Sequence, residues 1–418
     1  SEGVVIFVDD EVCPEDECKV EIVKKHKSYY IAKVKELIKP SPYRVKPFCP
    51  MHKVCGACQL QHIDYKEQLV IKRQLVEDVM RGLDVDVKEV VPSPQIKEFR
   101  HKIQYPIRQT SVSKRLLAGY FKPKSHDLVN IKYCPIQPKI CDEIVEFIRD
   151  NSSKYGIDGY DEKHHKGLLK HVVIRSSVLD STQLVVLVVN AKKETKELRT
   201  FAEVLFENFE SIVGVSLNFN PNKTNLIMTK DTKSVIGKEY IKEKLCDTVF
   251  KIGANTFFQV NPESANNIFQ YVKNYISDNF KTPIILDAYA GISAFGLSLS
   301  KVAKTVVTVE ENKESVELAK SLKNENGIEN IYIYNSDCSE FFEKEFEEHK
   351  KGYDVTILDP PRKGCTQESL DYALKLTKSK IVYVSCNPAT LVRDLKYLKE
   401  HGAKIISLKP FDMFCHTT

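Results

Sequence analysis

Cys386 is the residue of this chain whose type and position point most directly to chemistry. It follows a predicted strand over residues 380–384, in a stretch where short apolar strands alternate with helical patterns. Open α/β sheets bind ligands at the carboxyl ends of their strands, so a thiol there is a candidate nucleophile beside a cofactor. The alternative is a buried cysteine that packs as a small hydrophobic side chain, the commoner fate of free cysteines. Position alone leaves both interpretations open.

Four other cysteines have a spacing that is typical of metal centres. The chain contains twelve cysteines, and Cys49, Cys55 and Cys58 form the pattern Cys-x5-Cys-x2-Cys, followed much later by Cys134 next to a proline. Two thiols spaced Cys-x2-Cys can bind one metal centre, and iron–sulfur clusters take four cysteine ligands, with a fourth ligand beside proline recurring among them. Structural zinc also accepts four cysteines but more often uses two Cys-x2-Cys pairs. The spacing therefore favours an iron–sulfur cluster over zinc, and either over unliganded thiols.

A cofactor pocket is predicted where three strands end near small or acidic residues. The strand over residues 284–287 is followed by a turn that contains Tyr289 and Gly291 and opens a helix. Glu310 ends the next strand, where an acidic residue can hydrogen-bond a ribose, and Asp337 follows the third strand, within reach of an adenine amino group. One glycine is too few for a dinucleotide pyrophosphate, so S-adenosylmethionine, a phosphate-free nucleoside, fits better. A purely structural strand–turn–helix is the alternative for any one of these residues.

A fourth strand, over residues 355–358, leads into Asp359-Pro360-Pro361-Arg362. This run is similar to the [Asp/Asn]-Pro-Pro-aromatic motif with which amino-group methyltransferases stack their target base. Because Arg362 occupies the aromatic position, methylation of an adenine amino group is disfavoured. Asp359 is then predicted to be a hydrogen-bonding carboxylate in the pocket.

The elements that must hold these residues fall into three predicted regions of an α/β protein. Residues 1–42 alternate apolar and polar like short strands, which suggests part of a small β-barrel. Residues 43–250 contain the cysteine loop, an amphipathic helix over 66–83 and mostly strands thereafter, which suggests an α+β domain. Over residues 251–418, strands alternate regularly with helices up to a last expected strand at 403–408, which indicates a doubly wound sheet.

Composition sets wide limits on location and partners. A net charge of +5 over 418 residues permits a nucleic-acid partner without requiring one. Basic residues cluster with aromatic ones over 19–46 and 97–124, which suits contacts to RNA but equally suits a solvated surface. The longest apolar run, 184–189, is too short to span a bilayer and no secretory segment is recognisable, so we expect a cytoplasmic protein that does not bind membranes. We expect a monomer.

Taken together, these residues make the chain resemble the iron–sulfur branch of the RNA uracil-5-methyltransferases, which methylates 23S rRNA. The resemblance covers nearly the whole chain and rests on the four cysteines, on residues 257–261, 286–291 and 359–364, and on the run from Val384 to Leu391. It implies a Rossmann-like methyltransferase domain, a [4Fe–4S] cluster in the central region, and an incomplete TRAM domain over residues 1–42 that binds RNA. It also implies that Gln259, Tyr289, Glu310 and Asp359 contact the cofactor or the target base.

The chemistry implied by this resemblance starts at Cys386. Its thiolate adds to C6 of a uridine and so makes C5 nucleophilic toward the methyl group of S-adenosylmethionine. The expected reaction is methylation at C5 of a uridine in 23S rRNA; a uridine in the tRNA T-loop and a non-catalytic RNA-binding relative are the alternatives. A radical mechanism is disfavoured because it would use the spacing Cys-x3-Cys-x2-Cys.

The C-terminus departs from the pattern of this family. There, Asp-Met-Phe-x-His-Thr is followed shortly by a glutamate that removes the C5 proton, whereas this sequence stops at Thr418. We therefore expect the 418-residue chain to methylate its target but to eliminate the product slowly. We do not expect His416 to replace the glutamate, because it lies at a chain end that should fray.

Overall fold

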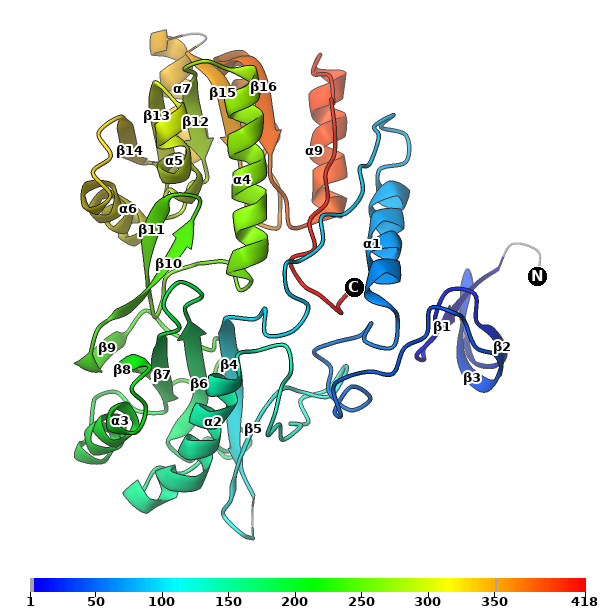
Figure 1. Cartoon of the computed structure of the whole chain (residues 1–418), viewed down its shortest axis with the longest axis vertical. Helices are drawn as coiled ribbons and strands as arrows, with labels where there is room; N and C mark the ends of the chain where they lie inside the picture. Colours follow the sequence, from blue (N-terminus) through cyan, green and yellow to red (C-terminus); the bar gives the residue numbers. More distant parts are fainter. Residues whose placement is uncertain (1–3, 111, 350–351) are drawn as a thin grey trace.

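The computed structural model describes residues 4–110, 112–349 and 352–418. Along this described part of the chain, a three-stranded sheet, a six-stranded sheet, a two-stranded hairpin and a five-stranded sheet follow one another (Figure 1). All pairings in the five-stranded sheet are parallel. The predicted α/β fold with a parallel sheet is therefore confirmed, while the domain boundaries at residues 42 and 250 stay predictions.

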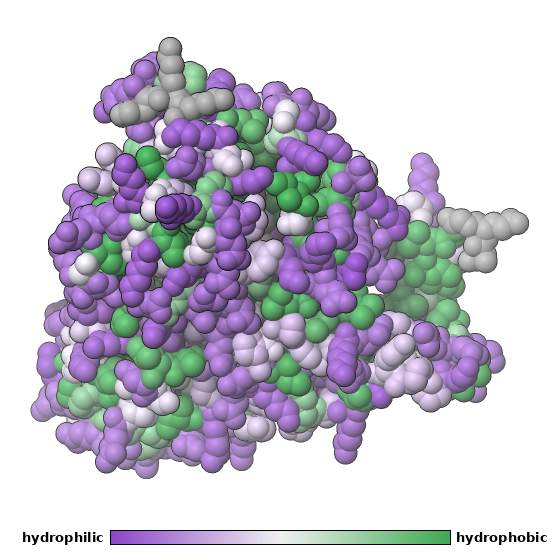
Figure 2. All heavy atoms as spheres, turned by 45° about the horizontal axis from the view of Figure 1, so that its top comes forward, coloured by the Kyte–Doolittle hydropathy of each residue, from purple (hydrophilic) through white to green (hydrophobic). Residues whose placement is uncertain are grey.

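The N-terminal sheet projects to one side of the molecule (Figure 1). Its strands lie in the order β1-β3-β2, with β3 parallel to β1 and antiparallel to β2. Val5, Phe7, Val23 and Ile38 are exposed, and Figure 2 shows a hydrophobic area over this part of the surface. The assignment of this sheet to a TRAM domain stays a prediction. Its strands are β1 (Val5–Val8), β2 (Glu17–Lys25) and β3 (Tyr29–Lys39).

Helix α1 (Tyr65–Val79) follows the cysteine loop and contacts α9 (Pro388–Glu400) at the far end of the sequence (Figure 1). The Asp64 carboxylate accepts a hydrogen bond from the Lys66 amide at 3.0 Å and so caps the first turn. The helix ends at Val79 rather than at the predicted residue 83, since Gly82 already has a left-handed backbone with φ of 87°.

The central sheet has six strands in the order β5-β4-β6-β7-β8-β9. Alternate side chains of β4, such as Ile103, Tyr105 and Ile107, are buried in one core with residues of α2 and α3, which therefore cover one face. The mixture of strands and helices predicted here is present. Its elements are β4 (Lys102–Gln109), β5 (Leu116–Ala118), α2 (Lys139–Asn151), β6 (Leu169–Ser176), β7 (Gln183–Val189), α3 (Lys196–Asn208), β8 (Ile212–Phe219) and β9 (Thr232–Gly237).

The parallel sheet has the order β14-β13-β12-β15-β16, so the chain changes direction across the sheet between β12 and β15. Ligands of open α/β sheets bind at such a switch point, beyond the carboxyl ends of the strands. The strands are β12 (Ile284–Ala288), β13 (Thr305–Glu310), β14 (Ile331–Asn335), β15 (Tyr353–Leu358) and β16 (Thr377–Tyr383). The hairpin of β10 (Tyr240–Leu245) and β11 (Thr248–Gly253) precedes them, and the helices are α4 (Pro262–Asn279), α5 (Ala294–Leu299), α6 (Lys313–Glu325), α7 (Cys338–His349), α8 (Gln367–Leu376) and α9.

The prediction of a strand over residues 403–408 is wrong. This segment does not join the parallel sheet; instead Leu408 bridges Val87 and Phe411 bridges Val91. Its apolar residues are typical of a strand, but a local pattern does not specify which segment a chain pairs with. The C-terminal segment consequently runs past α9 and ends beside α1 (Figure 1). No helix in the described ranges is long and apolar enough to cross a membrane.

Candidate active site

The turn after β12 is shaped by left-handed backbone conformations, with φ of 59° at Tyr289, 55° at Gly291 and 56° at Ser293. The Gly291 amide donates to Glu310 Oε2 at 2.8 Å, and the Asn312 amide donates to Glu310 Oε1 at 2.8 Å. Glu310 therefore joins the ends of β12 and β13. The structure brings the predicted Gly291 and Glu310 into direct contact at the carboxyl edge of the sheet.

Two further predicted residues of this edge bind the helices behind it. The Tyr289 hydroxyl donates to Ser369 Oγ at 3.2 Å, and its amide contacts Cys338 Sγ at 3.4 Å. Asp337 is exposed and accepts from the Ser339 amide at 2.7 Å, which caps the first turn of α7. Both residues thus lie at the edge where they were expected, and both have a structural contact there.

Asp359 and Cys386 follow two adjacent parallel strands, β15 and β16. The Val384 amide donates to the Leu358 carbonyl at 2.8 Å, so the strand pairing continues to within two residues of Cys386. Cys386 is exposed, and Asn387 after it caps α9, which places the thiol at the positive end of that helix. Burial raises the pKa of the Asp359 carboxyl to about 7. The Cys386 thiol and the Asp359 carboxyl group therefore lie at the same edge of the parallel sheet.

A hydrogen-bonded network that the sequence did not suggest holds these two loops together. Asp394, buried in α9, accepts from the Cys365 amide at 2.9 Å, from the Tyr383 hydroxyl at 2.6 Å and from Arg393 Nε at 2.7 Å. The loop approaches so closely that a Cβ on Gly364 would lie 2.6 Å from Asp394 Oδ2. A lone carboxylate inside an amphipathic helix carries no signal of such a role, so only the fold reveals it.

Gln259 lies in the loop between β11 and α4. It lines a cavity whose other walls come mainly from the central sheet and the hairpin, including His101, Arg175 and Glu243. The neighbouring Val260 carbonyl accepts from the His101 amide at 2.7 Å. The structure therefore places Gln259 at the junction between the central sheet and α4, without a hydrogen bond to Glu310, Asp359 or Cys386 in the described residues.

The four predicted metal ligands, Cys49, Cys55, Cys58 and Cys134, line one cavity together. Burial raises the pKa of Cys58 to about 11 and that of Cys134 to about 12, since the pocket is lined mainly by apolar groups. Within the described ranges, no group of three or more His, Cys, Asp or Glu side chains is arranged to hold a single metal ion. Four thiols around one apolar cavity fit the donor set of an iron–sulfur cluster, which stays a prediction.

The expectation of a frayed end at His416 is wrong, because this residue is buried with 2% of its surface exposed. Its amide donates to Gln68 Oε1 at 3.1 Å, its Nε2 lies 2.8 Å from the Ile96 carbonyl, and its own carbonyl accepts from the amides of Gln59 and Leu60. Hydrogen bonds to segments far away in sequence fix the C-terminal residues. A prediction from chain position alone could not include them.

A parallel sheet whose switch point carries a glycine turn and an acidic strand end is typical of S-adenosylmethionine-dependent methyltransferases, and this fold defines the class of the protein. The family model described as tRNA (uracil-5-)-methyltransferase matches residues 64–418. The chain belongs to this family, and it is an S-adenosylmethionine-dependent RNA methyltransferase.

Individual relatives match over almost the full chain. A protein of Clostridium tetani named as an uncharacterized RNA methyltransferase is 36% identical over 415 residues, which cover 99% of this chain and 89% of that protein. A protein of Oceanobacillus iheyensis with a similar name is 34% identical over 421 residues, covering 100% and 90%. The crystal structure of Pyrococcus abyssi tRNA (uracil-54, C5)-methyltransferase in complex with S-adenosyl-L-homocysteine has a TM-score of 0.77 and 27% identity, covering 100% of this chain and 94% of that one.

Proposed function

We propose that this protein methylates C5 of a uridine in 23S rRNA through a covalent bond between Cys386 Sγ and C6 of the base. The observation that carries the proposal is the exposed Cys386 thiol beside the Asp359 loop, at the carboxyl edge of the parallel sheet. The four cysteines on which the resemblance to the 23S rRNA enzymes rests lie around one cavity.

The residues at this edge can activate the target uracil and orient it for methyl transfer. The Cys386 thiolate forms a bond to C6, and the electron pair of the C5–C6 double bond moves toward C5 and the O4 carbonyl. Bound S-adenosylmethionine would supply the methyl group that C5 attacks, with the S–CH3 bond broken and S-adenosylhomocysteine as the leaving group. A base then removes the C5 proton, and the thiolate leaves C6 as the double bond returns. Asp359 and Gln259 orient the uracil by hydrogen bonds to its carbonyls and ring NH.

Glu310, Gly291, Tyr289 and Asp337 would hold the cofactor. Glu310 is placed for a ribose hydroxyl, because both of its oxygens face the turn after β12 and the start of the loop after β13. Gly291, with φ of 55°, lets the turn bend beside the cofactor without a side chain. Asp359 completes the cofactor-facing edge on the other side of β12.

We further propose that Cys49, Cys55, Cys58 and Cys134 hold a [4Fe–4S] cluster that fixes the surrounding fold, and that residues 1–42 contribute a TRAM-type sheet that binds RNA. None of the twelve cysteines is in a disulfide, which suits a reducing compartment, and on that ground we propose a cytoplasmic protein. A target uridine must leave its stack to reach Cys386, which costs a few kcal/mol and favours a uridine in a loop.

A uridine in tRNA is the second candidate target. It is favoured by the likeness to the Pyrococcus abyssi enzyme, whose name specifies tRNA uracil-54. The test offers methyl-labelled S-adenosylmethionine with either 23S rRNA or tRNA and separates the products on a denaturing gel. Label in rRNA, free or in a shifted protein–RNA band, supports the proposal when Cys386→Ala abolishes it and Cys246→Ala does not.

Label confined to tRNA moves the assignment to the tRNA enzyme. Label that persists in Cys386→Ala overturns the covalent mechanism. Wild-type protein that binds RNA but transfers no label to either substrate favours a non-catalytic RNA-binding relative.

A further inference from the structure

Two positively charged side chains lie opposite each other on adjacent strands of the central sheet, at the cavity that Gln259 lines. Lys102 of β4 and Arg175 of β6 are direct cross-strand partners, so their side chains project from the same face. Both line this cavity. Like charges placed directly opposite each other destabilise a sheet, which calls for a compensating group.

In the described part of the chain, no carboxylate forms an ion pair with Lys102 or Arg175. Arg175, with 3% of its surface exposed, donates from Nε and Nη2 to the Ala254 carbonyl and from Nη2 to the Thr256 carbonyl. Glu243 lies in the same cavity wall, but its oxygens accept from the amides of Val178 and Lys244. The pair therefore keeps two positive charges that neutral carbonyls satisfy only in part.

Three further observations indicate that charged and polar groups in the cavity wall lack a partner. Burial and the nearby cations Arg175 and Arg100 lower the pKa of Lys102 to about 8, and burial lowers the pKa of Arg175 to about 10. In the same wall, Nδ1 of His101 is buried without a hydrogen-bond partner in the described residues. A buried cation without a counter-charge is costly, so this cavity is a candidate site for an anion.

The location of the cavity indicates which class of anion would bind there. It lies where the central sheet meets the loop that precedes α4, and this loop contains Gln259. A uridine that has left its stack keeps a phosphate on each side, so a base held near Gln259 brings a phosphate close to the same cavity. Arginine and lysine both give phosphate oxygens charge-assisted hydrogen bonds. In Arg175 the group that can do so is Nη1, because Nε and Nη2 already donate to the two carbonyls.

We propose that Lys102 and Arg175 bind a backbone phosphate next to the target uridine of the RNA. This inference rests on the proposed function, which supplies the RNA, and it assigns to the like-charge pair a substrate-positioning role. The rival ligand is the carboxylate of the methionine part of S-adenosylmethionine, which has the same charge.

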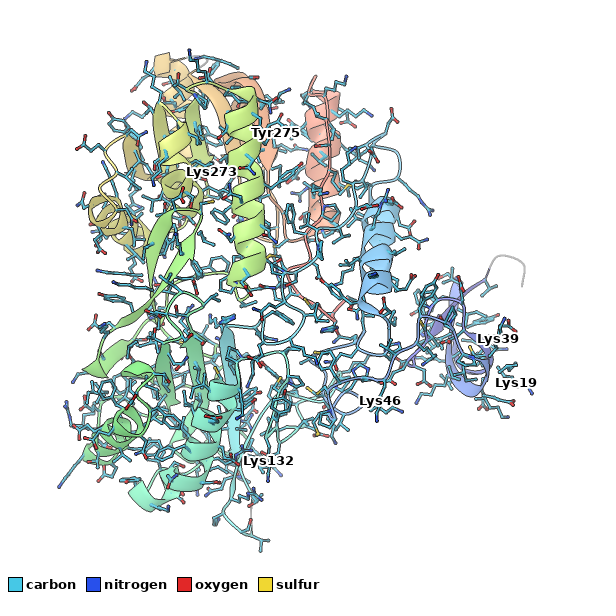
Figure 3. The ribbon with its side chains drawn as sticks, in the orientation of Figure 1. Lys19, Lys39, Lys46, Lys132, Lys273 and Tyr275 are labelled. Atoms are coloured by element: carbon cyan, nitrogen blue, oxygen red, sulfur yellow. The ribbon has the colours of Figure 1, made fainter. Side chains whose placement is uncertain are left out.

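The experiment measures the dissociation constants of 23S rRNA and of tRNA for the wild-type chain and for Lys102→Gln over a series of KCl concentrations. Loss of one phosphate contact should reduce the slope of log K against log salt by about 0.7–0.9 and weaken binding at low salt. Affinity for S-adenosylmethionine, measured by calorimetry, should not change. Lys273→Gln is the matched control, because Lys273 on α4 is also largely buried but pairs with Asp247 at 2.7 Å (Figure 3).

A second readout separates phosphate binding from a structural role. Removing the like-charge repulsion should raise the melting temperature of RNA-free Lys102→Gln, whereas a lysine needed for folding would lower it. Arg175→Lys keeps the charge and loses the guanidinium that the Ala254 and Thr256 carbonyls hold in place, so it should keep the salt slope and weaken RNA binding several-fold. An unchanged slope in Lys102→Gln, or weakened S-adenosylmethionine binding with an unchanged slope, would overturn the inference. Failure of methyl transfer by the wild type would instead count against the proposed function, since the binding assay does not require transfer.

Discussion

The side-chain amide of Asn387 donates a hydrogen bond to the main-chain carbonyl of Arg362 at 3.2 Å. The Thr390 hydroxyl donates to the same carbonyl at 3.2 Å. Through these bonds, the loop that follows Asp359 is joined to the start of the helix that follows Cys386. The proposed nucleophile, Cys386, and the proposed base-binding carboxylate, Asp359, therefore lie on segments that are held together. Asp394 strengthens this connection by accepting a hydrogen bond from the Cys365 amide.

Asp394→Asn should loosen this connection. Replacing one carboxylate oxygen by an NH2 group removes an acceptor from a buried network and should lower the free energy of unfolding by about 1–3 kcal/mol. Misplacement of the loops by about 1 Å should reduce kcat by up to roughly 100-fold, with a smaller effect on KM for S-adenosylmethionine. The rate at which iodoacetamide alkylates Cys386 should change as well, which a purely global loss of stability would not cause.

The matched control for that experiment is Asp371→Asn. Asp371 also accepts from a tyrosine, the Tyr397 hydroxyl at 2.9 Å, but this pair joins α8 to α9 away from the Asp359 loop. Its kcat should stay near the wild-type value. Wild-type kcat and wild-type alkylation in Asp394→Asn would show that the network does not position the site.

Asp359→Asn should stabilise the cofactor-free protein at neutral and alkaline pH. Burial raises the pKa of Asp359 from 3.8 to about 7, so between these values the folded wild type binds more protons than the unfolded chain. Wild-type stability therefore falls as pH rises through this window, by at most about 1.4 kcal/mol per pH unit from this group. Urea denaturation at pH 5 and pH 8 should show that the advantage of Asp359→Asn grows with pH.

Asp86→Asn is the control for this pH dependence. The exposed Asp86 carboxylate accepts a hydrogen bond from Lys88, which lowers its pKa, so it is ionised in the folded and unfolded chain at both pH values and the stability of Asp86→Asn relative to the wild type should not change between pH 5 and pH 8. An advantage of Asp359→Asn that is the same at pH 5 and pH 8 would contradict the burial of an ionisable carboxyl at position 359.

Cys55→Ser and Cys134→Ser should each abolish the proposed iron–sulfur cluster. Protein purified without oxygen should contain about four iron atoms and matching sulfide per chain in the wild type. Both variants should lose iron, and they should unfold more easily because the cysteines share a core with Phe99, Ile131 and Ile136. Cys246→Ser, in the hairpin turn, is the control and should keep its iron. Stoichiometric zinc without iron would mean that the cavity holds zinc instead.

His416→Gln should change the acid stability of the protein. Desolvation lowers the pKa of His416 below 6.5 in the folded state, so below that pH the unfolded chain binds the extra proton and wild-type stability falls. Glutamine has no group that binds this proton in the unfolded chain. The stability of the variant relative to the wild type should therefore improve as pH falls from 7 to 5. At pH 7 it should be about 1–3 kcal/mol less stable, since contacts to Gln68 and Ile96 are lost. Parallel denaturation curves for both proteins at pH 5 and pH 7 would contradict the buried position of the imidazole.

Local patterns in the sequence were sufficient to predict the strand ends of the parallel sheet. Asp287, Glu310 and Asp359 each follow an apolar run, and parallel strands bring their carboxyl ends to one edge whatever the rest of the chain does. Cys386 was predictable for the same reason. Spacing likewise identified Cys49, Cys55 and Cys58 as a group, because a loop of ten residues keeps its thiols close.

The sequence by itself thus determined which chemical groups are present and to which strand or loop each belongs. Only the tertiary structure decided the relationships between distant segments: Cys134 beside the three earlier cysteines, Lys102 opposite Arg175, Asp394 beneath the Asp359 loop, and His416 buried against α1. The physical reason is that these contacts depend on sheet register and on the packing of whole elements. The free energy of such packing is summed over many residues, and no short pattern records it.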